Sequence, residues 1–501
     1  MGTLAPPVKT NAKLQYKGRE ILNWDPENTA QWKAEGRKVA NRNLWISVFA
    51  VNLAFCVWLV WSAIVINLPR VGFQYTQSQL FMLAALPGLS GATFRIFYSF
   101  LVPVVGGRRW TFISTALLMI PAVGIGFAVQ NVSTPYWVMA GLSLLSGFGG
   151  GNFASSMANI SFFYPKRLQG YALGMNGGAG DFGTSVVQIL VPLAILAPVL
   201  TSIVGAPQQI VATAEHAAKA IETAGIHGVA SHVVKHAPET GQLWLQNAGF
   251  LWIPLTLIAL VFVWFGMNDL ASANSDPRKL LVIFRRKHNW LTSWLYLGTF
   301  GTFIGLAAAF ALLIKEVFPG HDPAAWGWTG AFIGGLIRPL GGWMSDKLGG
   351  ARVTFWVFIA LVLTTIAATF AVPGQGGIGG NFWWFIVTFE LLFFFTGIGN
   401  GSVYRMIPVI FHETVGKPRN PKDAAQVAAA DKEASQESAA VIGFSSAFAA
   451  YGAFIWPRLF GTSLHEWGSV RAAMWITLCV YVSGLAVVWW FYYRQGAEAP
   501  A

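Results

Sequence analysis

Charged side chains inside long apolar runs are the residues best placed to do chemistry in this chain. Three arginines, Arg95, Arg338 and Arg405, and two acids, Asp181 and Glu390, lie within such runs. A guanidinium at the centre of a bilayer costs roughly 3 kcal/mol even on permissive scales, so an arginine facing lipid is disfavoured. Its rigid planar fork can donate two parallel hydrogen bonds to a planar oxyanion, whereas lysine offers a point charge. These residues therefore predict a buried site for a small anion.

The composition sets the class of protein that surrounds this site. Of 501 residues, 54% are hydrophobic and 11% are charged, whereas soluble domains carry about 25% charge. We therefore predict an all-α integral membrane protein whose main surroundings are the lipid bilayer. The net charge of +12 is spread over many loops, so it does not indicate a nucleic-acid partner.

Neither the cysteines nor the histidines indicate an enzyme. Cys56 and Cys479 lie in apolar segments near opposite ends of the chain, and nearly all eight histidines lie in predicted loops. A membrane enzyme needs His, Glu or Cys clusters within or beside its spans. We expect no catalytic residues, no metal site and no cofactor.

Twelve apolar runs are long enough to cross the hydrocarbon core and predict twelve transmembrane helices in two six-helix halves. The runs fall near 44–68, 78–102, 110–130, 135–163, 168–200, 243–267, 290–314, 325–346, 352–372, 381–411, 438–463 and 470–492. The expected units are a cytoplasmic N-terminal segment 1–43, a first half 44–267 with an outer loop 201–242, a central cytoplasmic linker 268–289, a second half 290–492 and a cytoplasmic tail 493–501.

Basic residues predict the orientation of these spans. If the N-terminus lies inside, 24 of the 33 Lys and Arg fall in cytoplasmic segments and six fall in outer segments. The other three are the arginines within the predicted spans. This asymmetry follows the positive-inside rule and places both termini in the cytoplasm.

The two halves repeat one another around their second helices. Arg95, Gly106, Gly107, Arg109 and the pair Thr111-Phe112 recur 243 residues later as Arg338, Gly349, Gly350, Arg352 and Thr354-Phe355. The repeat places Arg95 and Arg338 opposite each other across a pseudo-twofold axis, as in porters that rock around a central site. We predict that both arginines bind the substrate; the alternative is a structural role such as capping carbonyl groups.

Two glycine-rich stretches carry a family resemblance. GGGNFASSMANISFFYPKRLQGYALGMNGGAGDFG, residues 149–183, resembles the nitrate signature of the NarK-type nitrate/nitrite porters of the major facilitator superfamily, and GIGNGSVYRMIPVIF, residues 397–411, resembles its partner in the second half. Small residues at three- and four-residue spacing allow close helix packing in membranes.

The resemblance implies the major facilitator fold and a transport function. It implies movement of nitrate inward and nitrite outward by alternating access across the bacterial inner membrane. It also implies that Phe153, Tyr296, Phe300 and Phe55 shape a slot for the flat anion. The segment GWMSDKLGGAR resembles the loop motif of the superfamily, so Arg109, Asp346 and Arg352 are assigned to a cytoplasmic gate.

The roles of several polar residues can be interpreted in two ways. Asn152, Asn176 and Ser155 can hydrogen-bond the substrate or cross-link helices. Arg405 can line the pathway or extend to the cytoplasmic surface. Glu390 lies near the outer side of its span, where it is interfacial or paired.

Asp181 departs from the family pattern, which commonly has Asn at this place. A buried carboxylate has either a cationic partner, here Arg95 or Arg338, or a proton. With both arginines unopposed, the empty carrier resists reorientation, which favours obligatory exchange. An ionised Asp181 eases the return of the empty carrier, and an Asp181 protonated with substrate couples nitrate entry to protons. Asp181 is therefore a coupling candidate or a structural ion pair.

The alternatives to exchange are nitrate/proton symport, an anion channel, and a porter for another small anion such as phosphate or formate. We expect a monomer. Within the outer loop, His216, His227, His232 and His236 could suggest a metal site, but no cysteine or carboxylate cluster joins them. A solvated amphipathic hairpin is the preferred interpretation.

Overall fold

The computed structural model describes residues 13–198, 205–210, 241–271, 282–417 and 423–501. Within these ranges the chain is mainly helical, and the only sheets are short. The histidines of the predicted outer hairpin lie outside the described residues.

The helices of the first half follow the predicted spans closely. Their bounds are α1 Thr29–Gln31, α2 Arg37–Trp58, α3 Val60–Ile64, α4 Gln77–Val105, α5 Gly107–Ala116, α6 Met119–Ala128, α7 Tyr136–Ser146, α8 Phe148–Phe163, α9 Lys166–Leu196, α13 Asn247–Phe250 and α14 Trp252–Gly266.

The helices of the second half continue in the same pattern. Their bounds are α15 Lys287–Tyr296, α16 Thr302–Val317, α17 Pro323–Trp326, α18 Thr329–Leu348, α19 Gly350–Ala371, α20 Phe382–Thr414, α21 Ala424–Ala450, α22 Gly452–Trp467 and α23 Arg471–Val488. A π-helical segment, Leu297–Gly301, joins α15 to α16.

Within the described residues, nine stretches of helix are long and apolar enough to cross a membrane. Each coincides with one predicted span. The predicted spans 44–68, 135–163 and 325–346 are also helical, as α2 with α3, α7 with α8, and α18. The molecule is a multi-pass membrane protein whose helices lie where the apolar runs predict them.

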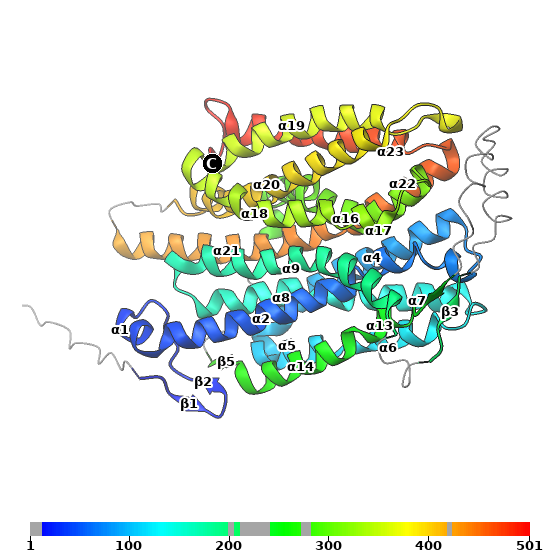
Figure 1. The fold of residues 1–501 in the computed structure, drawn as a ribbon. Helices are drawn as coiled ribbons and strands as arrows, with labels where there is room; N and C mark the ends of the chain where they lie inside the picture. The colour runs from blue at the N-terminus through cyan, green and yellow to red at the C-terminus, as the bar shows by residue number, and fades with distance from the viewer. Residues whose placement is uncertain (1–12, 199–204, 211–240, 272–281, 418–422) are drawn as a thin grey trace, which may run out of the picture.

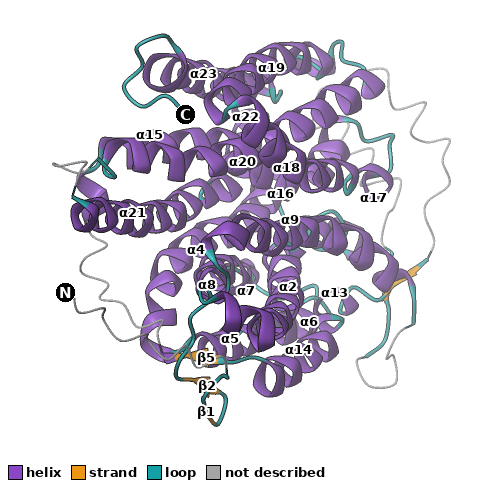
Figure 2. Ribbon diagram, turned by 90° about the vertical axis from the view of Figure 1, so that its left-hand side faces the viewer, coloured by secondary structure: helices purple, strands orange, loops and turns teal. Residues whose placement is uncertain are grey.

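The two halves lie side by side with their helices roughly parallel. Figure 1 shows the first half, blue to green, below the second half, light green to red, and Figure 2 shows the same helices nearly end-on. Between the halves, α4 packs against α21 and α22, α9 packs against α18, and α3 packs against α16.

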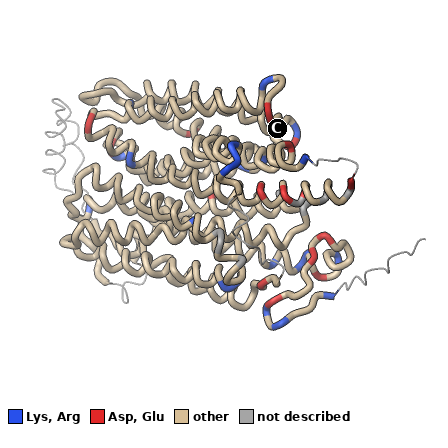
Figure 3. Tube along the Cα trace, turned by 180° about the vertical axis from the view of Figure 1, so that it is seen from behind, with Lys and Arg blue, Asp and Glu red and all other residues tan. Residues whose placement is uncertain are grey.

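The bundle has two ends, which differ in charge. The linker end, at the left of Figure 1, is where α9 begins and α18 ends; the loop end is where α3 and α16 end. Figure 3 shows charged residues concentrated at the linker end, on the right of that view. The long helical bodies are largely uncharged, as transmembrane helices require.

Five two-residue strands were not predicted. β1 Tyr16–Lys17, β2 Glu20–Ile21 and β5 Asp269–Leu270 form one small sheet, and β3 Gln208–Gln209 pairs with β4 Gln242–Leu243. β2 and β5 come from segments almost 250 residues apart and pair in parallel. Strands this short have no periodic sequence pattern that could have revealed them.

The helix of the eleventh predicted span begins earlier than the hydrophobic run predicts. α21 begins at Ala424, whereas the hydrophobic run predicts a start near 438. The first turns are rich in alanine and polar helix-forming residues, so they continue the helix beyond the apolar region. Asp423 caps it by accepting from the Ala425 backbone amide at 3.0 Å.

Candidate functional site

Arg95 lies fully buried on α4 and donates hydrogen bonds to groups on both halves. Its Nε donates to the Gly150 carbonyl at 2.9 Å, and its Nη1 donates to the Ser446 carbonyl at 3.0 Å and to the Ser446 hydroxyl at 2.9 Å. Gly150 lies on α8 and Ser446 on α21. The guanidinium is thus held at the boundary between the halves.

Aromatic rings surround the Arg95 guanidinium. Its Cζ lies 4.6 Å from the ring centroid of Phe153, 5.1 Å from Trp58, 5.4 Å from Phe300 and 5.9 Å from Phe55. Separations of this size allow cation–π attraction, which is strongest where water is excluded. The rings therefore stabilise the buried charge and confine the space beside it.

Arg338 lies on α18, is 7% exposed, and pairs with a carboxylate of the first half. Its Nη1 donates to Asp181 Oδ2 at 2.5 Å, and its Nη2 donates to the Tyr296 hydroxyl at 3.3 Å. Asn400 Nδ2 donates to the same Asp181 oxygen at 3.2 Å. Of the two partners considered for Asp181, the structure selects Arg338.

A stack of flat rings connects the surroundings of the two arginines. Tyr296 and Phe300 stack at 5.3 Å with 12° between their planes, and Phe300 stacks on Phe153 at 6.3 Å and 19°. Phe55 meets Phe153 edge-on at 5.7 Å. The π-helical segment that follows Tyr296 widens the turn, which brings residues four apart nearly into line. All four predicted aromatics thus adjoin the arginines, and such faces suit a planar anion.

The two glycine-rich stretches position the arginine-bearing helices. A Cβ on Gly150 would lie 2.7 Å from the Trp58 ring and 2.8 Å from the Gly91 Cα, so only glycine lets α8 approach α4 beside Arg95. A Cβ on Gly401 would lie 2.3 Å from the Arg338 carbonyl oxygen. Each stretch therefore allows one helix to lie directly against the backbone that carries an arginine.

Comparison with known proteins identifies the family of this architecture. The model of the Major Facilitator Superfamily matches residues 7–205. The nitrate/nitrite transporter NarU of Salmonella typhimurium is 43% identical over 97% of this chain and 99% of its own length. This chain belongs to the NarK-type porters of the major facilitator superfamily. NarU of Escherichia coli K12 is 43% identical over 95% of this chain and 96% of its own length. The probable nitrate/nitrite antiporter NarK2 of Thermus thermophilus is 37% identical over 97% of this chain and 99% of its own length.

Three polar residues of the NarK-type signature lie in a different environment. Asn152 and Ser155 line a small polar cavity of about 10 Å³ among α2, α5 and α8. Asn176 donates to the Ser156 hydroxyl at 2.8 Å. These contacts cross-link helices of the first half, and a cavity of this size has room for about one water molecule. A substrate contact for Asn152, Asn176 or Ser155 stays a prediction.

The predicted gate residues lie at the linker end. Asp346 forms a salt bridge with Arg405 across α18 and α20. Arg109 Nε lies 3.8 Å from Asp269 Oδ2, and the neighbouring Arg108 lies nearer, at 3.3 Å. Arg405 is thus paired at the surface with a residue of the loop motif.

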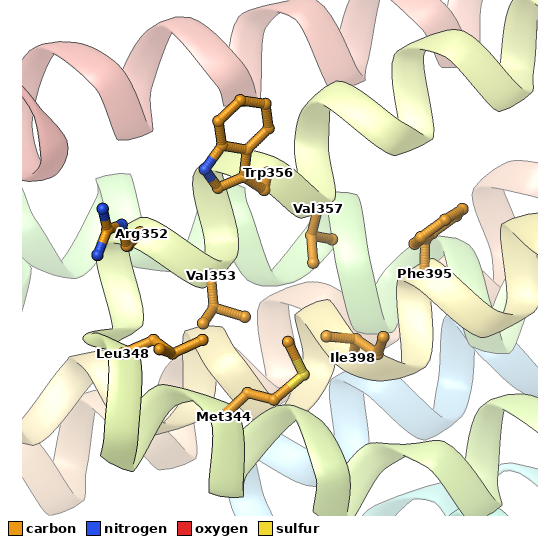
Figure 4. Close-up of a pocket in the computed structure, with 8 residues that line it drawn as sticks. All are labelled: Met344, Leu348, Arg352, Val353, Trp356, Val357, Phe395 and Ile398. Carbon is orange, nitrogen blue, oxygen red and sulfur yellow. The ribbon is translucent and has the colours of Figure 1, made fainter.

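Arg352 lines a separate pocket of about 420 Å³ among α18, α19 and α20 (Figure 4). The other side chains in the pocket are apolar, including Met344, Trp356 and Phe395. None of the described residues that surround Arg95 or Asp181 lines this pocket, so it is distinct from the arginine site.

Glu390 occupies a partly buried position near the loop end. Its Oε1 accepts a hydrogen bond from the Thr329 hydroxyl, and its Oε2 has no hydrogen-bond partner among the described residues. The partner is therefore a hydroxyl group of α18 and not a cation.

Helices α9 and α18 are in contact beside Asp181, and some of their glycines nearer the linker end have space beside them. A Cβ on Gly335 would lie 3.5 Å from the Asp181 backbone, whereas a Cβ on Gly174, Gly178 or Gly342 would have no neighbouring atom within 4 Å among the described residues. At the loop end, Gln77 donates to Glu316 at 2.7 Å and Lys315 donates to the Ile66 carbonyl at 2.7 Å, each across the two halves. The described contacts between the halves therefore lie both at the loop end and beside Asp181.

Sequence reasoning missed four residues of the site: Trp58, Asn400, Tyr404 and Ser446. Asn400 and Tyr404 lie inside the second glycine-rich stretch, so that motif already marked their neighbourhood. Tyr404 lies with its ring centroid 5.6 Å from the Arg338 Cζ. Ser446 contributes its backbone carbonyl as well as its hydroxyl, and a backbone contact of this kind has no sequence signal.

Proposed function

We propose that this protein exchanges nitrate for nitrite by alternating access, carrying nitrate into the cell and nitrite out. The main support is a pair of buried arginines, one from each half, that adjoin one continuous aromatic stack. Both substrates are planar monovalent oxyanions, which suit planar guanidinium groups and flat ring faces. Relatives that align over nearly the whole chain carry the names nitrate/nitrite transporter and nitrate/nitrite antiporter.

Arg95 and Arg338 would bind the anion from opposite halves. The rings of Phe153, Phe300 and Tyr296 would fix its plane and exclude water, which strengthens the charge interaction. Because the ligands belong to different halves, binding favours the arrangement in which the halves close around the anion.

Contacts between the halves at the loop end support alternating access rather than an open channel. We infer that the linker end is cytoplasmic, that both termini lie inside, and that this arrangement is inward-facing. The basic residues favour that orientation, and the space beside Gly178 and Gly342 is where we expect a route to the cytoplasm. The pairs Asp346–Arg405 and Arg109–Asp269 at this end are candidates for a gate. We also propose the bacterial inner membrane as the location and a monomer as the working unit.

The test is uptake of labelled nitrate into proteoliposomes loaded with nitrite or with an impermeant anion. We expect internal nitrite to accelerate uptake, external nitrite to compete, and phosphate and formate to compete weakly. Protein-free vesicles are the control. Uptake that internal nitrite does not accelerate would contradict exchange, and rapid conduction without competition would indicate a channel.

Nitrate/proton symport is the second candidate, because a buried carboxylate, Asp181, lies at the site. The same vesicles with an inward proton gradient separate the two. Symport predicts uptake that follows the proton gradient without internal nitrite, and exchange predicts uptake that follows internal nitrite.

A further inference from the structure

Asp181 connects the two halves at the centre of the candidate site. It lies on α9 of the first half, is 0% exposed, and accepts hydrogen bonds from Arg338 on α18 and Asn400 on α20. Its other oxygen, Oδ1, has no hydrogen-bond partner among the described residues. The cationic partner described for this buried carboxylate is therefore Arg338.

The Asp181 carboxylate has the chemistry of the proposed substrate. It is planar, carries one negative charge when ionised, and offers oxygen acceptors to the same guanidinium. Arg338 therefore already holds an anion in the empty carrier. We propose that Asp181 acts as a resident anion, which occupies Arg338 when substrate is absent and lets the empty carrier reorient. This proposal rests on the exchange function above.

The net charge of the site gives the electrostatic reason. Replacing Asp181 with Asn raises the charge of the site by one unit, and binding nitrate lowers it by one unit. The empty wild-type site therefore has the same net charge as the loaded Asp181→Asn site. The cost of burying charge rises steeply with its amount. If the Asp181→Asn carrier can reorient with nitrate bound, then the wild-type carrier can reorient without substrate at a similar electrostatic cost.

The position of Asp181 adds a mechanical reason. Helices α9 and α18 are close beside Asp181, because a Cβ placed on Gly335 would lie 3.5 Å from the Asp181 backbone. The Asp181–Arg338 pair thus joins the two halves where these helices are in contact. Without substrate, this pair supplies the link across the halves that the anion would otherwise provide.

The experiment compares net uptake with exchange in the wild type and in Asp181→Asn. Labelled nitrate enters proteoliposomes that contain either nitrite or only gluconate, with a potassium–valinomycin potential positive inside. In the wild type we expect uptake into gluconate vesicles, accompanied by inward movement of negative charge. In Asp181→Asn we expect exchange to continue while the ratio of net uptake to exchange falls at least tenfold.

Gln188→Ala is the matched control. Gln188 also lies on α9 and links the halves, since its Nε2 donates to the Ala307 carbonyl at 2.6 Å, but it is neutral. Its loss should leave the ratio of net uptake to exchange within about twofold of the wild type. An equal fall in Gln188→Ala and Asp181→Asn would assign the effect to bridging and would overturn the role of charge.

Two outcomes in the wild type alone decide the proposal even if the variant does not fold. The proposal is overturned if nitrate uptake by the wild type depends strictly on internal nitrite. It is also overturned if net uptake follows a proton gradient and ignores the membrane potential, because Asp181 would then carry a proton. If internal nitrite stimulates uptake in neither the wild type nor the two variants, the exchange function itself is refuted.

Nitrate binding gives an independent readout. Because the resident carboxylate competes for Arg338, its removal should tighten nitrate binding about tenfold, measured as nitrate-dependent thermal stabilisation in detergent. Unchanged or weaker binding in a folded Asp181→Asn protein would contradict the competition.

Discussion

Arg95 and Arg338 occupy matching positions in the two halves but have different surroundings. The acceptors described for Arg95 are a hydroxyl and backbone carbonyls, and four rings lie around its guanidinium. Arg338 donates to the carboxylate of Asp181 and to the Tyr296 hydroxyl. Each arginine nevertheless reaches across to the other half, through Ser446 or through Asp181. The repeat therefore preserves the cations and their bridging role while their partners diverge.

The difference indicates a division of labour. A carboxylate offsets the charge of a guanidinium, whereas a hydroxyl or a carbonyl group does not. We propose that Arg338 alternates between Asp181 and the substrate, while Arg95 keeps its hydrogen bonds to Gly150 and Ser446. Variants that alter one environment at a time test this comparison.

Arg95→Lys should have the largest effect. Lysine keeps the charge but loses the planar fork that spans Gly150 and Ser446 and lies among the rings. We expect nitrate/nitrite exchange to fall about 100-fold, the loss of roughly 3 kcal/mol of charged hydrogen bonding. Initial rates in proteoliposomes, normalised to reconstituted protein, measure it. Arg494→Lys, at the end of the last helix, is the control, and near-normal exchange by Arg95→Lys would refute its role as a ligand.

Arg338→Lys should have a smaller effect, about a tenfold fall in exchange, or roughly 1.4 kcal/mol. An ammonium can still pair with Asp181 as a point charge, so the link between the halves survives while the geometry toward substrate is degraded. The same exchange assay measures it. A loss equal to that of Arg95→Lys would show that the two sites are equivalent and would remove the proposed division of labour.

Tyr296→Phe should have the smallest effect, about a threefold rise in the KM for nitrate, or roughly 0.6 kcal/mol. It removes one 3.3 Å hydrogen bond from Arg338 and keeps the ring stacked on Phe300. Tyr404→Phe is the matched control, because the Tyr404 hydroxyl is buried without a hydrogen-bond partner among the described residues. The comparison fails if Tyr404→Phe raises the KM as much as Tyr296→Phe does.

Much of the fold was predictable because lipid imposes simple rules on sequence. Each of the twelve predicted spans falls on helix, since an apolar run in a bilayer must satisfy its own backbone. The short sheet that joins Glu20 to Asp269 was not predictable, because two-residue strands pair through tertiary proximity alone.

The candidate site was predictable in part. A buried cation is costly, so Arg95 and Arg338 were identified by residue type and by the repeat. Asn152 and Ser155 share the same motif, yet they face a small cavity on another side of α8. A motif locates a helix, but helix rotation and packing decide which of its residues lie beside the two arginines.

The sequence by itself determined the membrane class, the helix positions, the twofold repeat and the two central arginines, because composition and hydrophobic run length act locally along the chain. The tertiary structure decided the choice of Arg338 as the partner of Asp181, the part of Ser446 in holding Arg95, and the contacts that join the halves at the loop end. Those features depend on distances between residues far apart in the chain, which no local pattern encodes.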